Sequence, residues 1–355
     1  MGIPSDGWLK LVSRNRRGPR NLITDVPGVL VGHRTLDDPS RNIHTGVTAI
    51  VPAEGDLFRE KIPAGAAVIN GFGKSTGILQ IQELGTIETP ILLTNTFGVG
   101  TGINALTKYM LKSHPEIGVS AGTVNCVVTE CNDGRLNDIR GMHLTEDDVF
   151  RALDSADVRF DEGAVGGGRG MVCMGLKGGI GSASRIVTAG QQEFTIGALV
   201  MTNFGSAGRL RINGERTRDG KPFYEMMKEL GASSSFERDS GSCILVVGTD
   251  LPMDSRQLTR VAKRAAAALG KTGSFIGTGS GDIAIAFSNG NRIPFDEKGL
   301  FSMRTVGEDG MDEVFEAAGE CLEEAILSSL YHGESMTGIR GNRVMGLAEF
   351  AAEER

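Results

Sequence analysis

Hydroxyl- and carboxyl-bearing residues stand at the heads of two apolar segments in the last third of the chain. Ser242 opens "SCILVVGTD" (242–250), and Ser280 and Asp282 lie in "GTGSGDIAIAFS" (277–288). Short apolar, β-branched runs that follow small polar residues are typical of buried strands. If the two strands are neighbours, these three residues can meet at one end of a sheet.

Two interpretations of Ser242 follow from these residues. In the simpler one, a turn serine leads into a core strand. In the other, Ser242 is a nucleophile, but no histidine lies nearby in the sequence to act as its base. Cleavage of the Gly241–Ser242 bond would free the α-amine of Ser242, whose pKa of ~7.7 makes it a competent general base at neutral pH. Gly241 leaves that peptide bond open to strain or attack because it has no side chain.

Two glycine-rich segments resemble nucleotide-binding loops without having their spacing. In "NGFGKST" (70–76), Val68 occupies the position where a P-loop needs its first glycine. In "GGGRGMVCMGLKGGIGSASR" (166–185), Met171 occupies the last glycine position of a dinucleotide fingerprint. We therefore expect no nucleotide cofactor, and we interpret the second segment as a compact connection close to an active site.

The composition excludes several other classes of protein. A net charge of −7 over 355 residues argues against nucleic acid or an anionic membrane surface as the main partner. The sequence has neither an apolar signal segment nor 18 consecutive apolar residues, so we expect no membrane span. Five cysteines without CxxC or zinc spacing indicate reduced thiols in the cytoplasm, and five scattered histidines offer no metal pair. We expect neither a metal nor a cofactor.

Strand and helix patterns alternate along the chain after a polar N-terminal arm, residues 1–20, which we expect to be poorly ordered or to dock on a partner subunit. Apolar runs predict strands at 46–53, 66–71, 90–96, 124–130, 196–205, 243–250 and 282–288. Capping residues and apolar stripes predict helices at 146–156, 256–270 and 311–333. The segment 206–241 is polar and rich in Gly and Ser, which predicts an exposed approach to Ser242.

The chain resembles the self-processing family that comprises the L-aminopeptidase/D-esterase and the β-peptidyl aminopeptidases. The resemblance runs from about residue 20 to residue 348 and is specific because many motifs match in order. They include "NLITDVPGVLVGH" (21–33), "GVTAIVP" (46–52), "NGFGKSTG" (70–77), "ELGTIETPILLTNTFGVG" (83–100), "DGRLNDI" (133–139), "EGAVGGGRGMVC" (162–173), "KGGIGSASR" (177–185), "TNFG" (202–205), "SCILVVGTDLP" (242–252), "GSGDIAIAFS" (279–288) and "MTGIRGN" (336–342).

The resemblance implies an α/β fold, a four-layer αββα sandwich of the N-terminal-nucleophile-like (DOM) type. It implies one catalytic domain, residues 21–355, that cuts itself between Gly241 and Ser242 into an α chain (1–241) and a β chain (242–355). The implied activity is release of N-terminal residues, of D-, L- or β-type, from small peptides, amides or esters through an acyl-enzyme. It also implies a homo-oligomer, a tetramer of cleaved units.

The resemblance also assigns roles to individual residues. Ser242 matches the nucleophile, and Ser280 and Asp282 match the serine and the acid that assist it. Asn203, in "TNFG", matches the asparagine whose amide stabilises the oxyanion. Glu130 matches an acid that pairs with the free amine of the substrate.

Arg135 departs from the family pattern, which often has Tyr in "DGYLND" where this chain has "DGRLND". A guanidinium cannot donate a proton as a phenol does, but it can pair with a carboxylate. We therefore interpret Arg135 as a substrate-binding residue that affects specificity, with a solvated surface arginine as the alternative.

Two other functions compete with this interpretation. The ornithine acetyltransferases resemble the family in fold and self-cleavage, but their nucleophile is Thr after "KGA", whereas here Ser follows "DSG". A non-catalytic homologue that serves as a binding protein is the second alternative. It would have no reason to retain Asn203, Ser242, Ser280 and Asp282 together.

Overall fold

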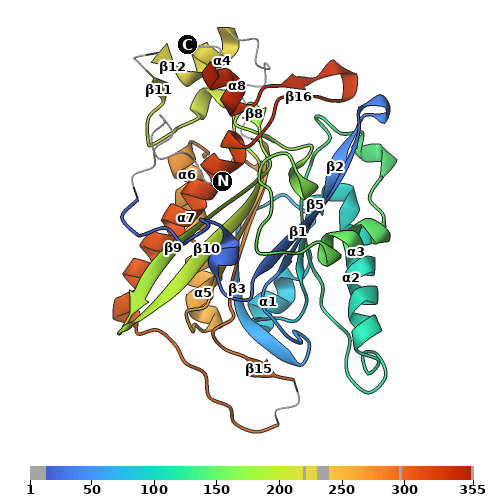
Figure 1. The fold of residues 1–355 in the computed structure, drawn as a ribbon, viewed down its shortest axis with the longest axis vertical. Coiled ribbons are helices and arrows are strands. Elements are labelled where there is room, and N and C mark those ends of the chain that lie inside the picture. Colours follow the sequence, from blue (N-terminus) through green and yellow to red (C-terminus); the bar gives the residue numbers. More distant parts are fainter. Residues whose placement is uncertain (1–12, 219–220, 230–239, 296–297, 353–355) are drawn as a thin grey trace.

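The computed structural model describes residues 13–218, 221–229, 240–295 and 298–352. Its two main sheets are stacked on each other and enclosed by helices (Figure 1). The smaller sheet has the order β1-β2-β5-β6, with β1 (Leu30–Asp38), β2 (Ile43–Val51), β5 (Ile91–Asn95) and β6 (Val127–Cys131).

The larger sheet has the order β15-β3-β14-β13-β10-β9, and β4 pairs with β3. Its strands are β3 (Glu60–Gly71), β4 (Thr86–Ile87), β9 (Ile180–Ala189), β10 (Gln192–Asn203), β13 (Ser240–Thr249), β14 (Gly279–Ser288) and β15 (Ile293–Pro294). β13 and β14 are parallel neighbours, with Ser242 beside Gly281, and β10 runs antiparallel to β13, with Asn203 opposite Ser242. The strand that Ser242 begins is therefore central in the sheet.

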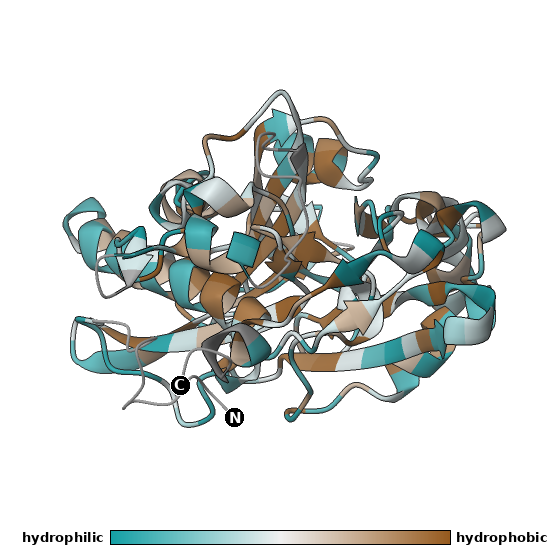
Figure 2. Ribbon diagram, turned by 90° about the horizontal axis from the view of Figure 1, so that it is seen from above, coloured by the Kyte–Doolittle hydropathy of each residue, from teal (hydrophilic) through white to brown (hydrophobic). Residues whose placement is uncertain are grey.

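Helices cover the outer face of each sheet. The smaller sheet packs on α2 (Val99–Ser113) and α3 (Glu146–Asp154), and the larger sheet packs on α5 (Ser255–Ala262), α6 (Ala265–Thr272) and α7 (Met311–Tyr331). A third apolar cluster fills the space between the sheets, where Ile50 and Leu93 of one sheet meet Ile244 and Ile285 of the other. Figure 2 shows hydrophobic residues concentrated in these inner layers. The predicted αββα sandwich is confirmed.

Short elements complete the described chain. They are α1 (Ile78–Leu84), α4 (Phe223–Glu229), α8 (Leu347–Ala352) and three two-stranded ribbons: β7 (Val172–Cys173) with β8 (Leu176–Lys177), β11 (Thr217–Arg218) with β12 (Lys221–Pro222), and β16 (Met336–Thr337) with β17 (Arg343–Val344).

All seven predicted strands are present, but the sequence patterns missed β1 and β9. Both of these strands carry many small or polar residues, "LVGHRTLDD" and "IGSASRIVTA", so neither has an apolar run of the kind used to find the others. β1 ends the smaller sheet and is mostly half-exposed, which explains its polar residues. In β9 small residues allow close packing on α7, because a Cβ at Gly181 would lie 1.9 Å from the carbonyl oxygen of Ala325.

Two other predictions are wrong in detail. The predicted helix 256–270 is two helices, α5 and α6, which are separated at Lys263 and Arg264, and the second ends at Gly273. The predicted exposed segment 206–241 is only partly described. Within its described part, α4 buries Phe223, Met226 and Met227 in the core that lies under α7.

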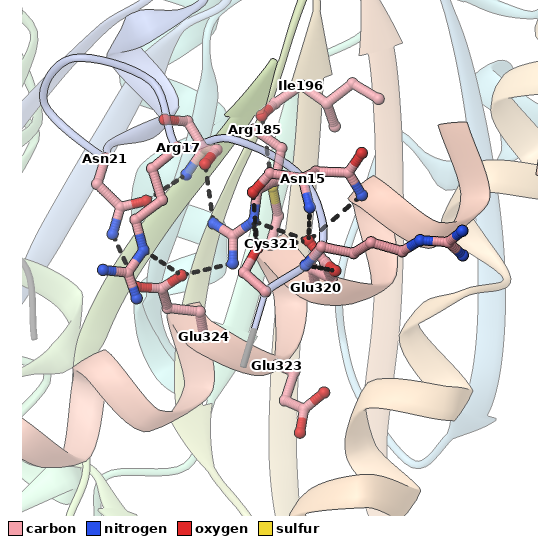
Figure 3. A network of polar contacts seen from close by, with 12 residues as sticks. Asn15, Arg17, Asn21, Arg185, Ile196, Glu320, Cys321, Glu323 and Glu324 are labelled. Carbon is pink, nitrogen blue, oxygen red and sulfur yellow. Dashed lines mark hydrogen bonds and ion pairs between the residues drawn. The ribbon is translucent and has the colours of Figure 1, made fainter. Parts of the chain in front are cut away.

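The described part of the N-terminal arm, residues 13–20, packs on α7 of the same chain (Figure 3). Arg185 of β9 reaches the same place with a side chain that is 1% exposed, and it pairs with Glu324 at 2.6 Å and Glu320 at 3.0 Å. The Ser13 hydroxyl also donates to Glu320, at 2.7 Å, and Arg17 pairs with Glu324 at 2.8 Å. These contacts tie the first part of the chain to the segment that follows Ser242.

Candidate active site

Ser242 is 4% exposed and lies at the beginning of the central strand β13. Its hydroxyl donates a 2.6 Å hydrogen bond to the carbonyl oxygen of Gly241, the residue before it. Gly241 has a φ of +134°, and a Cβ there would lie 1.9 Å from the carbonyl oxygen of Asn203. Only glycine fits at this position, so the backbone brings the Gly241 carbonyl beside the Ser242 hydroxyl without steric interference.

Asn203 ends β10 and is 7% exposed. Its Oδ1 accepts a 2.9 Å hydrogen bond from the Val172 N–H, and its Nδ2 donates a 3.0 Å hydrogen bond to the carbonyl oxygen of Asn132. The antiparallel register pairs Asn203 directly with Ser242. The side-chain amide is therefore held in one orientation at the end of the sheet where Ser242 begins its strand.

Ser280 and Asp282 are fully buried on β14, and the Ser280 hydroxyl donates a 2.8 Å hydrogen bond to Oδ1 of Asp282. They lie at the same end of the sheet as Ser242, as predicted, because β13 and β14 are parallel and in register. However, side chains alternate between the two faces of a sheet. Ser242 shares its face with Gly281, whereas Ser280 and Asp282 share the other face with Cys243. The three residues therefore lie at one end of the sheet, with the Ser242 side chain on the opposite face from the other two.

Glu130 lies on β6 of the smaller sheet and is 3% exposed. Its Oε1 accepts a 2.8 Å hydrogen bond from the Lys74 N–H, and its Oε2 accepts one from the Thr96 hydroxyl. Gly73 separates this carboxylate from β14, because a Cβ at Gly73 would lie 3.3 Å from Oε1 of Glu130 and 3.9 Å from Cα of Gly281. Glu130 of the smaller sheet and Gly281, the strand neighbour of Ser242 in the larger sheet, therefore lie on the two sides of Gly73.

Arg135 lies in the loop 132–138 that follows β6, and it is partly exposed. Partial burial lowers the pKa of its guanidinium. Its carbonyl oxygen accepts a 2.9 Å hydrogen bond from the Asn342 side chain, so the C-terminal segment holds this loop. The same loop supplies the Asn132 carbonyl that binds Asn203.

Two buried charged residues near Asn203 were not predicted. Asp133 is fully buried, and burial raises the pKa of its carboxyl to about 7. The charge of Glu130 adds to this effect, and hydrogen bonds from Thr45 and Asn137 oppose it. Lys177 is also fully buried, and burial lowers the pKa of its amine well below the usual value. Both residues lie within the quoted motifs "DGRLNDI" and "KGGIGSASR", which was the only signal available in the sequence.

Across residues 13–218, 221–229, 240–295 and 298–352, no group of three His, Cys, Asp or Glu side chains is placed to hold a metal ion. Within the same ranges no helix has the length and apolarity needed to cross a membrane.

Comparisons with known proteins agree with this geometry. Residues 21–344 match the model of peptidase family S58. The chain is 36% identical to the β-peptidyl aminopeptidase BapA of Sphingosinicella xenopeptidilytica, over 98% of this chain and 87% of BapA. The PH0078 protein of Pyrococcus horikoshii OT3 has a similar structure, with a TM-score of 0.88 and 42% identity over 97% of each chain. The L-aminopeptidase D-Ala-esterase/amidase of Ochrobactrum anthropi, described as a variant of the N-terminal-nucleophile hydrolase fold, has a TM-score of 0.83 and 35% identity, over 98% of this chain and 97% of its own.

The αββα sandwich, with a buried serine at the beginning of a central strand, defines the class of N-terminal-nucleophile hydrolases. Within that class, the chain belongs to peptidase family S58. The predicted family, the predicted fold and the predicted hydrolase class are therefore confirmed.

Proposed function

We propose that this peptidase cuts its own Gly241–Ser242 bond and then releases N-terminal residues from small peptides, amides or esters. The observation that carries the proposal is the position of the Ser242 hydroxyl, 2.6 Å from the oxygen of the carbonyl that it would attack. Aminopeptidase names among relatives that are 36% and 35% identical support the activity.

The proposed self-cleavage is an acyl shift from nitrogen to oxygen. Ser242 Oγ attacks the carbonyl carbon of Gly241, and its proton passes to the departing nitrogen as the C–N bond breaks. Water then hydrolyses the resulting ester, which leaves a carboxylate on Gly241 and restores the hydroxyl of Ser242. The nitrogen becomes the α-amine of Ser242 and can act as the general base in later turnovers.

In substrate hydrolysis, Ser242 Oγ attacks the acyl carbon, its proton passes through the α-amine to the departing amine or alcohol as that bond breaks, and water later releases the acid from the acyl-enzyme. The Ser280 hydroxyl, oriented by Asp282, hydrogen-bonds the new α-amine, because the strand register places Ser280 beside Gly241, where the chain is cut. The second hydrogen on Nδ2 of Asn203, together with backbone N–H groups, stabilises the oxyanion. Cys243 does not compete as a nucleophile, because burial raises the pKa of its thiol well above the usual value.

Glu130 binds the free amine of the substrate in this proposal. Its two hydrogen bonds, from Lys74 and Thr96, fix the carboxylate, and each carboxylate oxygen can accept a further bond. The acid therefore selects substrates by their N-terminal amine. Arg135 lies in the loop that follows Glu130 and affects which side chains are accepted.

The mass of the intact, freshly purified protein tests the proposal. We expect two species that correspond to residues 1–241 and 242–355, and a single uncut 355-residue species after substitution Ser242→Ala. Ser242→Cys is the matched control, because a thiol remains a nucleophile and can still process the chain. Cleavage of the alanine variant at the same bond would assign the attack to another residue.

Assembly and location stay predictions. Apolar side chains near α1 are exposed, with Phe72 at 62%, Leu79 at 84% and Leu84 at 64%, which supports a homo-oligomer; light scattering of the purified protein would show whether it is the predicted tetramer. All five cysteines are free and buried, which supports the predicted cytoplasmic location.

A further inference from the structure

The side-chain amide of Asn203 is bound by two backbone groups that accept no other orientation. A backbone N–H only donates, so Val172 requires the oxygen Oδ1, and a backbone carbonyl only accepts, so Asn132 requires the nitrogen Nδ2. A flipped amide would bring two donors together on one side and two acceptors together on the other. The direction of Nδ2 therefore depends on how firmly these two peptide groups are held.

Lys177 holds the first peptide group. Its Nζ donates to the carbonyl oxygen of Met171 at 2.8 Å, and that carbonyl belongs to the same peptide group as the Val172 N–H. Nζ also donates to the carbonyl oxygens of Gly168, at 3.1 Å, and Gly178, at 2.6 Å. Burial favours the neutral amine, but three carbonyl acceptors need three N–H donors, and only the ammonium supplies them. The ammonium also polarises the Met171–Val172 peptide, which strengthens the N–H as a donor.

Asp133 holds the second peptide group. The carbonyl of Asn132 is bonded to the backbone nitrogen of Asp133, so anchoring the side chain of Asp133 fixes that peptide. Oδ2 of Asp133 accepts a 2.6 Å hydrogen bond from the Thr45 hydroxyl, and Oδ1 accepts a 3.0 Å bond from the Asn137 amide. The backbone oxygen of Asp133 also accepts from the N–H groups of Leu136 and Asn137, which closes the loop into a turn.

We propose that Lys177 and Asp133 are positioning residues for the peptidase reaction, and that they act through Asn203. One fixes the donor on one side of the Asn203 amide, the other fixes the acceptor on the other side, and together they aim Nδ2 at the reacting carbonyl. The two residues approach from different segments, strand β8 and the loop 132–138, so this orientation does not depend on β10 alone. This inference rests on the proposed role of Asn203 in stabilising the oxyanion.

A double-mutant cycle tests the inference. Lys177→Met and Asp133→Asn are each made in the wild-type protein and in the Asn203→Ala variant. The kinetic constants kcat and KM are measured with alanine and β-alanine p-nitroanilides and normalised to the cleaved fraction found by intact mass. We expect Asn203→Ala to lower kcat by about 10²- to 10³-fold. Each positioning variant should lower kcat by roughly ten- to a hundredfold with a much smaller change in KM.

In the Asn203→Ala background, we expect either positioning variant to lower kcat by less than about twofold, because the group that it aims is gone. Equal losses in both backgrounds would overturn the inference, while the loss from Asn203→Ala alone would still support the proposed role of Asn203. No loss from Asn203→Ala would instead overturn that role.

Arg185→Met is the matched control, since it removes another buried cation, with a side chain 1% exposed, whose partners are Glu320 and Glu324 of α7. Its effect on kcat should be the same in both backgrounds. Asp133→Asn changes little in volume, so the inference stays testable if Lys177→Met does not fold.

Discussion

Two carboxyl groups, the partly buried Glu320 on α7 and the fully buried Asp133 beside the candidate site, have pKa values that are shifted in opposite directions. Burial alone raises the pKa of Glu320, but hydrogen bonds from the Arg14 N–H, the Ser13 hydroxyl and Arg185 outweigh it and bring the pKa below its usual value. Burial also raises the pKa of Asp133, and there the hydroxyl of Thr45 and the amide of Asn137 oppose it too weakly, so the value is about 7.

The opposite pKa shifts arise because Glu320 has a charged hydrogen-bond partner, Arg185, and Asp133 has neutral ones. Glu320 shares Arg185 with Glu324, and Arg17 also pairs with Glu324. In this α7 network (Arg17, Arg185, Glu320 and Glu324) the charges neutralise one another. At the end of the sheet, neutral groups bind Asp133, and Lys177 is bound by backbone carbonyls. The first arrangement stabilises the fold. The second leaves a charge incompletely compensated, which is a cost that natural proteins accept where groups must be positioned for chemistry.

The largest effect that we expect on stability comes from breaking the α7 network. Arg185→Met should lower the free energy of unfolding by about 3–5 kcal/mol, because it leaves buried carboxylates without their main cation. The loss should lie toward the lower end, since Arg17 and Asn21 still bind Glu324 at 2.8 Å each. Urea unfolding in the uncut Ser242→Ala background measures it. An unchanged kcat/KM in the cleavable protein would support the comparison, and a large kcat loss would contradict it.

The next effect is the pH dependence of stability, which should differ in sign between the two carboxyls. Asp133 has an ordinary pKa of 3.8 and a folded-state pKa of about 7, so between these values the folded chain keeps a proton that the unfolded chain loses. Its contribution therefore falls as pH rises from about 4 to 7. One pKa unit corresponds to about 1.4 kcal/mol, which predicts a loss of a few kcal/mol across this window.

The contribution of Glu320 has the opposite sign. Its folded-state pKa lies below the ordinary 4.5, so its stabilisation is present above that pH and is lost as pH falls further. Urea unfolding of the uncut protein from pH 3.5 to 8 measures both contributions. Asp133→Asn should reduce the loss of stability between about pH 4 and 7, and Glu320→Gln should reduce the loss of stability below pH 4.5. If Asp133→Asn leaves the change in stability between about pH 4 and 7 unaffected, the Asp133 carboxyl is ionised in the folded state at pH 5.

The sequence predicts, for a physical reason, which residues lie together at the end of the larger sheet. The apolar runs after Ser242 and before Ser288 are both fully buried strands, and matching ends of parallel strands lie together, so Ser242 and Ser280 were expected at one end of the sheet. Their opposite faces could not be predicted in this way. They follow from a register in which Ser242 aligns with Gly281 and not with Ser280, and the sequence alone does not give that register.

Other features depend on contacts that no local pattern encodes. Lys177 binds backbone carbonyls of a glycine-rich loop, and any sequence can supply a carbonyl, so nothing beside Lys177 indicates that it is buried. The break between α5 and α6 falls at Lys263 and Arg264, two good helix formers, without Gly or Pro to predict it. The helix α2 begins in "VGTG", where two glycines obscured its start.

A smaller effect is expected from the amine of the substrate. Acetylation of the N-terminus of a good substrate should remove its proposed contact with Glu130. A lost charge-assisted hydrogen bond costs about 1.5–3 kcal/mol, or roughly ten- to a hundredfold in kcat/KM. Free and acetylated p-nitroanilides measure this. Glu130→Gln is the matched variant, because it should reduce turnover of the free-amine substrate and leave the acetylated one nearly unchanged. Equal turnover of both substrates by the wild-type protein would rule out an aminopeptidase.

The smallest effect concerns Arg135, which lies in the same loop as Asp133 but has a partly exposed side chain. Its backbone oxygen is bound by Asn342, so replacing the side chain by that of Tyr leaves the loop attached. In its proposed role, the guanidinium favours substrates with an acidic side chain and competes with the substrate amine for Glu130. Because partly exposed ion pairs contribute about 0.2–1 kcal/mol, Arg135→Tyr should change the ratio of kcat/KM between acidic dipeptides and neutral amides by roughly two- to fivefold.

Self-cleavage of the Arg135→Tyr variant should be unchanged, as followed by intact mass. Equal ratios across a panel of amides and dipeptides would place Arg135 among the solvated surface residues, and loss of processing would place it in the catalytic machinery beside Asp133.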